Sequence, residues 1–418
     1  MTNRKNMSRH IITGIDVGTS TVRVVVAEPR TDGAISSFSL LGYGLSPAVG
    51  MRRGAVVDVS AAAESIRQAV EKAAQHAGVA IDHAYVGFGG SGFGSIMAKG
   101  IVAVSRADGE ISEADIVRVH AVARANLPSL ANKEILQELV VQYAVDKESS
   151  VRQPIGMIGN RLEAHILYLT AFSPHLRNLV RAIEAAGISV DDIVPAPLAS
   201  VYATLTKHQQ QIGVLHLDLG GETATCAVYD EGSLLSIQVF PVGATHITHD
   251  IAIGFQLPLE AAEAIKIAHG AVAGEESAFR REMIHFGEFA PHIPLTVSRW
   301  DLAEIMEART VDIFELVEKY LRRMGRAGLL PAGVIFTGGG ARVPGLVEFS
   351  RRALRLPAQV GTIHILDAEH ELAGDAAWAT AVGLVGLMCT TRQKSRVPNF
   401  IPSKWGGYVM RLIRSLIP

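Results

Sequence analysis

Hydrophobic residues near the start of the chain predict two strands joined by a tight turn. An apolar run from Ile11 leads into Asp16 to Ser20, and apolar residues then recur at every second position. Alternation with a period of two is typical of a half-buried strand, and small residues between two such runs favour a turn. Residues 214–229 repeat this pattern around Asp218 to Thr223. The repetition indicates two halves built on a common plan.

Helical patterns follow both predicted strand pairs. Apolar residues recur at three- and four-residue spacing in residues 61–77 and 259–269, which predicts amphipathic helices. A third apolar run, residues 334–336, leads into Thr337 and three consecutive glycines, and a helical period resumes from Leu346. The pattern as a whole predicts a mixed α/β fold with a third glycine-rich loop between a strand and a helix.

Composition narrows the class of protein. The chain has 418 residues, 48% of them hydrophobic, and a net charge of -2, which argues against a broad basic face for nucleic acid. Cys226 and Cys389 stand far apart in apolar surroundings, so a disulfide framework is excluded. Residues 1–10 are polar and basic, unlike a secretory signal. The longest mainly apolar stretch, 376–389, is shorter than the roughly 20 residues of a spanning helix, so we expect any membrane contact to be peripheral.

The turns of the two strand pairs have the residues that a nucleotide site without a Walker loop needs. Asp16 and Asp218 each end a strand before a turn that contains glycine, so they can face each other across a cleft and hold Mg²⁺ through water. Glycine amides and hydroxyls would contact the phosphates, and the third loop would admit the nucleoside. Each turn taken alone is equally an ordinary hairpin turn. The contributing residues are Gly18, Thr19, Ser20, Gly220, Gly221, Thr223, Gly338, Gly339 and Gly340.

Four longer stretches resemble a known family. They are Gly50 to Asp58, Pro241 to Gly254, Glu260 to Lys266 and Thr337 to Leu346. Their order and content resemble the actin, Hsp70 and sugar kinase superfamily and, within it, the FtsA family of bacterial cell-division proteins. The resemblance covers nearly all of the chain and implies an actin-like ATPase fold, with two duplicated halves around a nucleotide cleft.

The resemblance also implies the parts of the site and its ligands, ATP and Mg²⁺. Residues 16–20 become the first phosphate loop, 218–223 the second, including Glu222, and 338–340 the adenosine loop. Glu263 and Lys266 would reach ribose or adenine, although a solvated helix face is the alternative for this pair. Asp218 is the candidate for polarising an attacking water.

Three departures from the family pattern predict slow hydrolysis at most. Thr21 stands where the family often has Lys, and Glu222 replaces the usual third Gly of the second loop, where a carboxylate repels phosphate. Val141 lies in the register of a Gln that orients water in the family. We therefore leave open whether the chain is an effective enzyme.

The resemblance implies a division into subdomains. The first-half core (1A) would comprise 11–84, 166–206 and 371–390, and an interaction subdomain (1C) of the FtsA type would comprise 85–165. The second-half core (2A) would comprise 207–244 and 328–370, and subdomain 2B would comprise 245–327. In the family, 1C serves self-assembly and division partners, and 2B receives the C-terminal peptide of the tubulin homologue FtsZ.

The C-terminus predicts attachment to a membrane. Residues 391–403 contain two prolines and read as a flexible tether, and 404–418 form an amphipathic helix with basic residues on one side. From Arg392 onward the tail has no acidic residue, which suits an anionic surface. Docking on the protein's own core is the alternative. The membrane-facing candidates are Lys404, Trp405, Tyr408, Val409, Arg411, Leu412, Ile413, Arg414 and Leu416.

Together these features predict a peripheral protein on the cytoplasmic side of the cell membrane at the division site. It would bind ATP, assemble into polymers and tether FtsZ filaments while the septum forms. Two other functions stay open. One is a metabolic kinase or chaperone-like ATPase of the same superfamily, and the other is an adaptor for pilus assembly.

Overall fold

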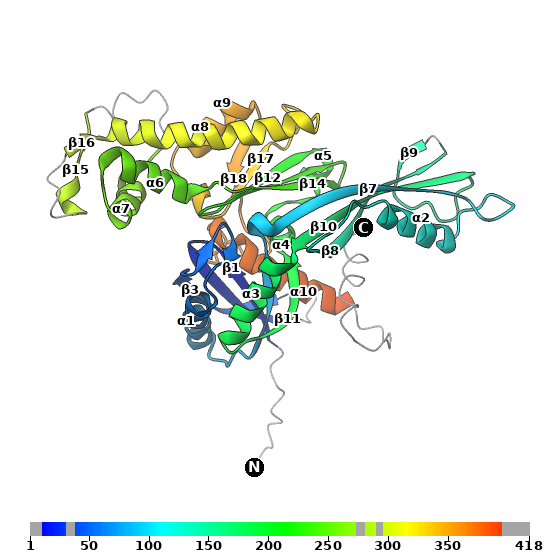
Figure 1. Cartoon of the computed structure of the whole chain (residues 1–418), viewed down its shortest axis with the longest axis horizontal. Helices are drawn as coiled ribbons and strands as arrows, with labels where there is room; N and C mark the ends of the chain where they lie inside the picture. Colours follow the sequence, from blue (N-terminus) through cyan, green and yellow to red (C-terminus); the bar gives the residue numbers. More distant parts are fainter. Residues whose placement is uncertain (1–10, 31–37, 147, 273–280, 290–295, 395–418) are drawn as a thin grey trace, which may run out of the picture. The chain divides into compact units, whose positions relative to one another are not determined.

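A computed structural model describes residues 11–30, 38–146, 148–272, 281–289 and 296–394 of the chain. The chain divides into two compact units (Figure 1). Unit 1 takes its described residues from the segments up to Gly89, from His175 to Thr204 and from Thr362 onward. Unit 2 takes them from Gly90–Pro174 and Leu205–Gly361.

Unit 1 is built on a five-stranded sheet in the order β11-β6-β1-β2-β3. The predicted hairpin is confirmed, because β1 and β2 pair antiparallel. β3 continues antiparallel beside β2, whereas β6 and β11 run parallel to β1 on the other side. The strands are β1 (Ile12–Val17), β2 (Thr21–Pro29), β3 (Phe38–Pro47), β6 (His83–Phe88) and β11 (Ser189–Pro195).

Helices cover both faces of this sheet. α1 (Val59–Ala77) begins where Asp58 accepts a hydrogen bond from Ala61 N–H, and it ends at Gly78 with φ of 65°. It packs so closely on β3 that a Cβ on Gly44 would lie 2.0 Å from Ala69 O. α10 (Ala379–Lys394) packs on the other face, and its residues up to Cys389 are buried around most of its circumference. The remaining elements are α3 (Ser173–Ala185), α4 (Ala196–Thr204), η5 (Ala376–Trp378) and the short hairpin β4 (Met51–Arg52) and β5 (Ala55–Val56).

Unit 2 contains a second sheet of the same plan, in the order β14-β13-β12-β17-β18. Its central hairpin is again antiparallel, and two parallel strands again follow on one side. The predicted duplication is therefore confirmed at the level of sheet topology. The strands are β12 (Val214–Leu219), β13 (Ala224–Asp230), β14 (Ser233–Phe240), β17 (Val334–Thr337) and β18 (Ala358–Val360). The predicted strand, loop and helix after residue 334 are β17, η4 (Gly339–Arg342) and α9 (Leu346–Leu354), and α5 (Lys207–Ile212) precedes β12.

An inserted antiparallel sheet, in the order β7-β10-β8-β9, forms another part of unit 2. One face is covered by α2 (Glu113–Ala125), and Gly100 allows the close approach because a Cβ there would lie 2.1 Å from Val119 O. Ser95 attaches the insert to β14, since its hydroxyl donates to Ile237 O at 2.7 Å and accepts from Ile237 N–H at 3.0 Å. The strands are β7 (Phe93–Ala103), β8 (Lys133–Val145), β9 (Glu148–Val151) and β10 (Arg161–Phe172), and η1 (Gly90–Gly92) precedes them.

The insert begins and ends later than residues 85–165. β6 contains residue 85 but pairs with β1 and β11 in unit 1, so it belongs to the first-half core. β10 runs to Phe172 and pairs along its length with β7 and β8. The sequence pattern of a single strand does not show which sheet the strand joins. Strand pairing places the start of the insert after β6 and its end after residue 165.

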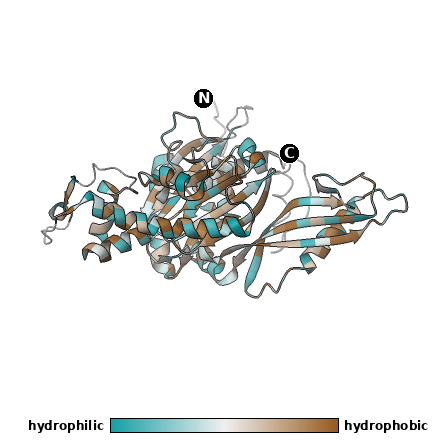
Figure 2. Cartoon of the chain, turned by 90° about the horizontal axis from the view of Figure 1, so that it is seen from above, coloured by the Kyte–Doolittle hydropathy of each residue, from teal (hydrophilic) through white to brown (hydrophobic). Residues whose placement is uncertain are grey.

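The rest of unit 2 is mainly helical. α6 (Ala244–Phe255), α7 (Leu259–His269) and α8 (Arg299–Arg323) surround a core that includes Ile247, Ile265 and Met306. Hydrophobic and hydrophilic residues alternate along α8 (Figure 2), as expected for a helix with one buried side. The short elements here are β15 (Met283–His285), η3 (Phe286–Glu288) and β16 (Thr296–Ser298).

α10 continues through residues 391–394, the start of the predicted tether. The remainder of the tether and the predicted amphipathic helix, residues 395–418, lie outside the described residues. Within the part of the chain that the structure describes, no helix has both the length and the hydrophobicity needed to cross a bilayer.

Candidate nucleotide-binding site

The first predicted phosphate loop joins β1 to β2 in unit 1. Gly18 N–H donates to Thr21 O at 3.0 Å, and a Cβ on Gly18 would lie 2.9 Å from that oxygen, so the tight turn needs glycine. Thr19 Oγ1 accepts a hydrogen bond of 3.0 Å from Gly54 N–H. The loop is thereby attached to the β4–β5 hairpin, and the Thr19 hydroxyl keeps a proton to donate.

The two aspartates occupy equivalent positions in their hairpins. Asp16 is the last residue but one of β1 and lies opposite Arg23, and Asp218 is the last residue but one of β12 and lies opposite Thr225. Both are partly exposed at the strand end. The duplicated plan therefore extends to the position of the acidic residue, while the partner across the strand differs between the halves.

Buried polar groups fix the carboxylate of Asp218. Thr337 Oγ1, which is fully buried at the end of β17, donates to Asp218 Oδ2 at 2.8 Å. His216 Nε2 lies 3.3 Å from the same hydroxyl, and burial lowers the pKa of His216 to about 3. Because Thr337 has one proton and gives it to Asp218, the neutral imidazole must donate from Nε2. Residues of the neighbouring strands β12 and β17 thus orient the carboxylate of Asp218.

Two of the three glycines after β17 are required by packing against the second phosphate loop. Gly338 has φ of 80°, and a Cβ there would lie 2.6 Å from Leu219 O and 3.0 Å from Asp218 Oδ1. A Cβ on Gly340 would lie 2.5 Å from Leu219 Cγ. A Cβ on Gly339 would meet no described atom within 4 Å. Gly338 and Gly340 therefore hold the third loop against Leu219, and Gly339 is the open position.

The start of α6 holds the second loop from the other side. Ala244 N–H donates to Gly220 O at 2.9 Å, and Thr245 N–H donates to Gly221 O at 2.7 Å. A Cβ on Gly243 would lie 2.5 Å from Gly220 O and 2.6 Å from Gly221 O. Gly243 was not among the predicted site residues, although it lies in the stretch 241–254 that carries the family resemblance.

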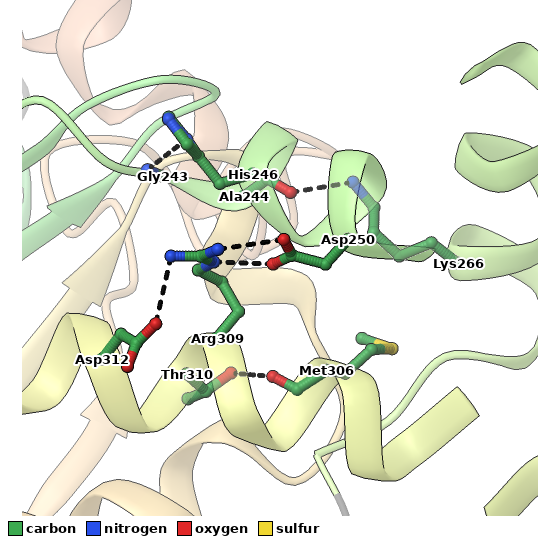
Figure 3. Close-up of polar contacts among 9 residues, drawn as sticks. All are labelled: Gly243, Ala244, His246, Asp250, Lys266, Met306, Arg309, Thr310 and Asp312. Atoms are coloured by element: carbon green, nitrogen blue, oxygen red, sulfur yellow. Dashed lines mark hydrogen bonds and ion pairs between the residues drawn. The ribbon is translucent and has the colours of Figure 1, made fainter. Parts of the chain in front are cut away.

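Glu222 lies close to a histidine of α6. The pKa of His246 is lowered by its burial and by Arg309 and His249, whereas Glu222 acts in the opposite direction. His246 Nδ1 accepts a hydrogen bond of 3.2 Å from Gly243 N–H (Figure 3). Glu222, which departs from the family pattern, thus lies near the imidazole of His246.

Lys266 and Glu263 lie beside the same helix. Lys266 Nζ donates to Glu263 Oε2 at 2.6 Å, to Thr248 Oγ1 at 2.8 Å and to Ala244 O at 3.3 Å. Only 10% of the Lys266 side chain is exposed, compared with 44% for Glu263. Lys266 therefore does not lie on a solvated helix face, because its side chain packs against the first turns of α6.

The position expected to orient water, Val141, lies elsewhere, and this corrects the sequence-based interpretation. Val141 is in β8 of the insert, where its carbonyl accepts a hydrogen bond of 2.9 Å from Ser233 Oγ. Ser233 pairs with Asp230 at the C-terminal end of β13, whereas the second loop joins β13 at Ala224, its N-terminal end. The length of that strand, about 20 Å, separates them. Val141 therefore carries no information about hydrolysis at this loop.

The described residues contain no group of three or more His, Cys, Asp or Glu side chains arranged to hold a metal ion. Asp16 and Asp218 stay predicted ligands through water. The tail residues 404–416 proposed for membrane contact lie outside the described part of the chain.

The architecture defines the class of protein. The chain superposes on a structure of the PilM-PilN type IV pilus biogenesis complex with a TM-score of 0.65 at 16% identity, covering 90% of this chain and 98% of the other. It superposes on MreB 5 of Spiroplasma citri bound to AMPPNP with a TM-score of 0.53 at 14% identity, covering 92% and 98%. With its duplicated sheets and glycine-rich loops, this chain has the actin-like fold.

Sequence relatives identify the family within that class. The model of the family "Cell division protein FtsA" matches residues 215–383, and that of the SHS2 domain inserted in FtsA matches residues 90–170. The cell division protein FtsA of Pseudomonas aeruginosa is 34% identical over 378 residues, which cover 90% of this chain and 89% of that protein. The chain belongs to the FtsA family of cell division proteins. The matched insert, 90–170, agrees with the boundaries that strand pairing gives.

Proposed function

We propose that this cell-division protein binds ATP with Mg²⁺ and hydrolyses it slowly at most. The observation that carries the proposal is the arrangement in unit 2, where Asp218 is oriented by Thr337 and surrounded by loops that only glycine permits. Such loops expose backbone amides to an anion. Fold likeness adds support, since MreB 5 of Spiroplasma citri was solved bound to AMPPNP.

Each residue has a role that its position supports. The amide of Gly221 would contact phosphate oxygens, together with the hydroxyls of Thr19, Ser20 and Thr223. Gly18 and Gly220 would let the phosphates approach the loop backbone, because their own N–H groups donate to Thr21 O and Thr223 O within the turns. Asp16 and Asp218 would hold the magnesium ion through water, and Asp218 would polarise the attacking water. Lys266 and Glu263 would reach the ribose or adenine, and Gly339 offers the open surface of the adenosine loop.

Glu222 is the feature that favours slow turnover. A carboxylate in the second loop repels phosphate, and its repulsion is reduced when nearby cationic side chains share its field. His246 lies near Glu222, but burial lowers the pKa of His246 and favours its neutral form, so this ring offsets little of the repulsion. A magnesium ion, when bound, would neutralise part of the phosphate charge, whereas the carboxylate of Glu222 would lower the affinity for ATP relative to glycine.

We further propose that the protein polymerises and links FtsZ filaments to the cytoplasmic face of the membrane during septum formation. The region 245–327 would receive the C-terminal peptide of FtsZ, and the insert would contact division proteins or a further copy of the chain. The tail 404–418 would lie on anionic lipid. A short amphipathic helix binds weakly alone, and a polymer raises its effective concentration, so assembly would strengthen membrane attachment.

Two measurements test these proposals. Calorimetric titration with ATP and Mg²⁺ should show saturable binding, and turnover should be slow and lost in Asp218→Ala. Brisk Mg²⁺-dependent turnover would contradict the slow-hydrolysis proposal, and substrate-dependent turnover without lipid binding would favour a metabolic kinase.

Membrane attachment is tested by co-sedimentation with vesicles rich in phosphatidylglycerol. The intact chain is compared with a truncation after Arg396, each with and without ATP. We expect binding by the intact chain alone, increased by ATP. Equal binding by both proteins would exclude the tail as the attachment device.

A further inference from the structure

The second phosphate loop and helix α8 are connected through a single helix. α6 begins directly at the loop, because Ala244 and Thr245 donate their N–H groups to Gly220 O and Gly221 O. Gly243 leaves no space for a side chain between the helix and these carbonyls. A shift of α6 along its axis, or a rotation about that axis, would therefore move the loop backbone or break these two hydrogen bonds.

A bidentate ion pair fixes α6 farther along. Arg309 of α8 donates from Nε to Asp250 Oδ2 at 2.6 Å and from Nη2 to Asp250 Oδ1 at 2.9 Å (Figure 3). Its third nitrogen, Nη1, donates to Asp312 Oδ2 at 3.1 Å. Asp250 lies six residues beyond Ala244, about 9 Å along the helix axis. Two parallel hydrogen bonds define orientation as well as distance.

The ion pair is sheltered, unlike others on the same helix. The side chains of Arg309 and Asp250 are 29% and 25% exposed, compared with 69% and 37% for Arg322 and Glu318 near the end of α8. Exposed pairs contribute little, whereas loss of one partner from a sheltered pair leaves a poorly solvated charge. Apolar contacts between α6 and α8 hold the helices together but are not directional. The ion pair is therefore a directional contact between α6 and α8 that can fix the rotation of α6.

We propose that Arg309 and Asp250 are positioning residues for the second phosphate loop, acting through the first turn of α6. The inference rests on the proposed binding of ATP for its functional consequence. It assigns a role in the nucleotide site to a residue of α8 that lies outside the predicted loops. It also implies that contacts which pull on Arg309 change the geometry of Gly220 and Gly221.

Hydrogen exchange of the intact protein without nucleotide tests the structural step. In Asp250→Asn and Arg309→Gln, the amides of Ala244 and Thr245 should exchange faster than in the unaltered protein, while amides of β12 and β17 keep their rates. Arg322→Gln is the matched control on α8 and should change neither set. Equal acceleration throughout unit 2 would mean that the pair only stabilises the fold and would overturn the proposal.

Calorimetric titration with ATP and Mg²⁺ tests the functional step. We expect about tenfold weaker binding in either single variant, an intermediate loss in Arg309→Lys, and no further loss in the double variant. Asp250→Asn is nearly isosteric and carries the test if Arg309→Gln does not fold. Unchanged affinity together with unchanged exchange at Ala244 and Thr245 would refute the positioning role. Absence of ATP binding by the unaltered protein would instead refute the proposed function, and the exchange measurement would still decide this inference.

Discussion

Thr337 Oγ1 lies 2.8 Å from Asp218 Oδ2 and donates a hydrogen bond to it. The two residues stand opposite each other on β12 and β17, which pair in parallel with Asp218 beside Thr337. The pairing of two strands far apart in sequence thus brings the Thr337 hydroxyl to Asp218, the aspartate proposed to polarise water.

Replacing Thr337 with valine should weaken the nucleotide site more than the fold. Valine has nearly the same shape but offers Asp218 no proton, and His216 Nε2–H loses its acceptor. We expect a loss of about 1–3 kcal/mol in the free energy of unfolding, with a clear drop in Mg²⁺-dependent ATP affinity. Thr337→Ser keeps the hydroxyl and serves as the control in thermal melting and calorimetry. Equal affinity in the valine and serine variants would show that the hydrogen bond does not orient Asp218.

The third loop allows a test with a matched pair of glycines. Gly338→Ala places a methyl group 2.6 Å from Leu219 O at a positive φ, whereas Gly339→Ala meets no described atom within 4 Å. We expect Gly338→Ala to unfold at lower denaturant concentration and to lose ATP binding, because the second loop must move. Gly339→Ala should retain the fold. A similar midpoint for both variants would contradict the packing role assigned to Gly338.

In the insert, Asp115 is the main structural acid. It is fully buried in the first turn of α2 and accepts hydrogen bonds from Ser105 and Ser112, with Arg118 as a third partner. Asp115→Ala should cost about 2 kcal/mol in the free energy of unfolding, since buried donors lose their acceptor. Glu113→Ala, an exposed change in the same turn, is the control in denaturant titration. Matching midpoints for the two variants would contradict this role.

The same carboxylate predicts a dependence of stability on pH. Burial alone would raise the pKa of Asp115, but its hydrogen bonds with Ser112, Arg118 and Ser105 outweigh burial and lower the pKa below 3.8. The folded state therefore binds the proton less readily than the unfolded state. The stabilisation is fully present above about pH 4 and is lost as pH falls toward the lowered pKa. Denaturant titrations between pH 3 and 6 should show a steeper acid loss for the unaltered protein than for Asp115→Ala.

Much of the site was predictable because its parts are local. Asp16 and Asp218 could be assigned to strand ends from the alternation around them, and small residues marked both turns. Gly243 could not be assigned in this way, since the need for glycine there arises from Gly220 and Gly221 across the loop. The distance between Val141 and the second loop was equally hidden, because it depends on how the insert pairs with β14.

Sequence by itself determined the duplicated hairpins, the three glycine-rich loops, the helices and the family resemblance, because each depends on residues close together in the chain. Tertiary structure decided which sheet β6 joins, where the insert begins, why Gly338 and Gly340 are glycine, and that Arg309 contacts Asp250. These features depend on hydrogen bonds, steric contacts and charges between segments far apart in sequence. Local periodicity specifies the type of an element, and pairing and packing specify its neighbours.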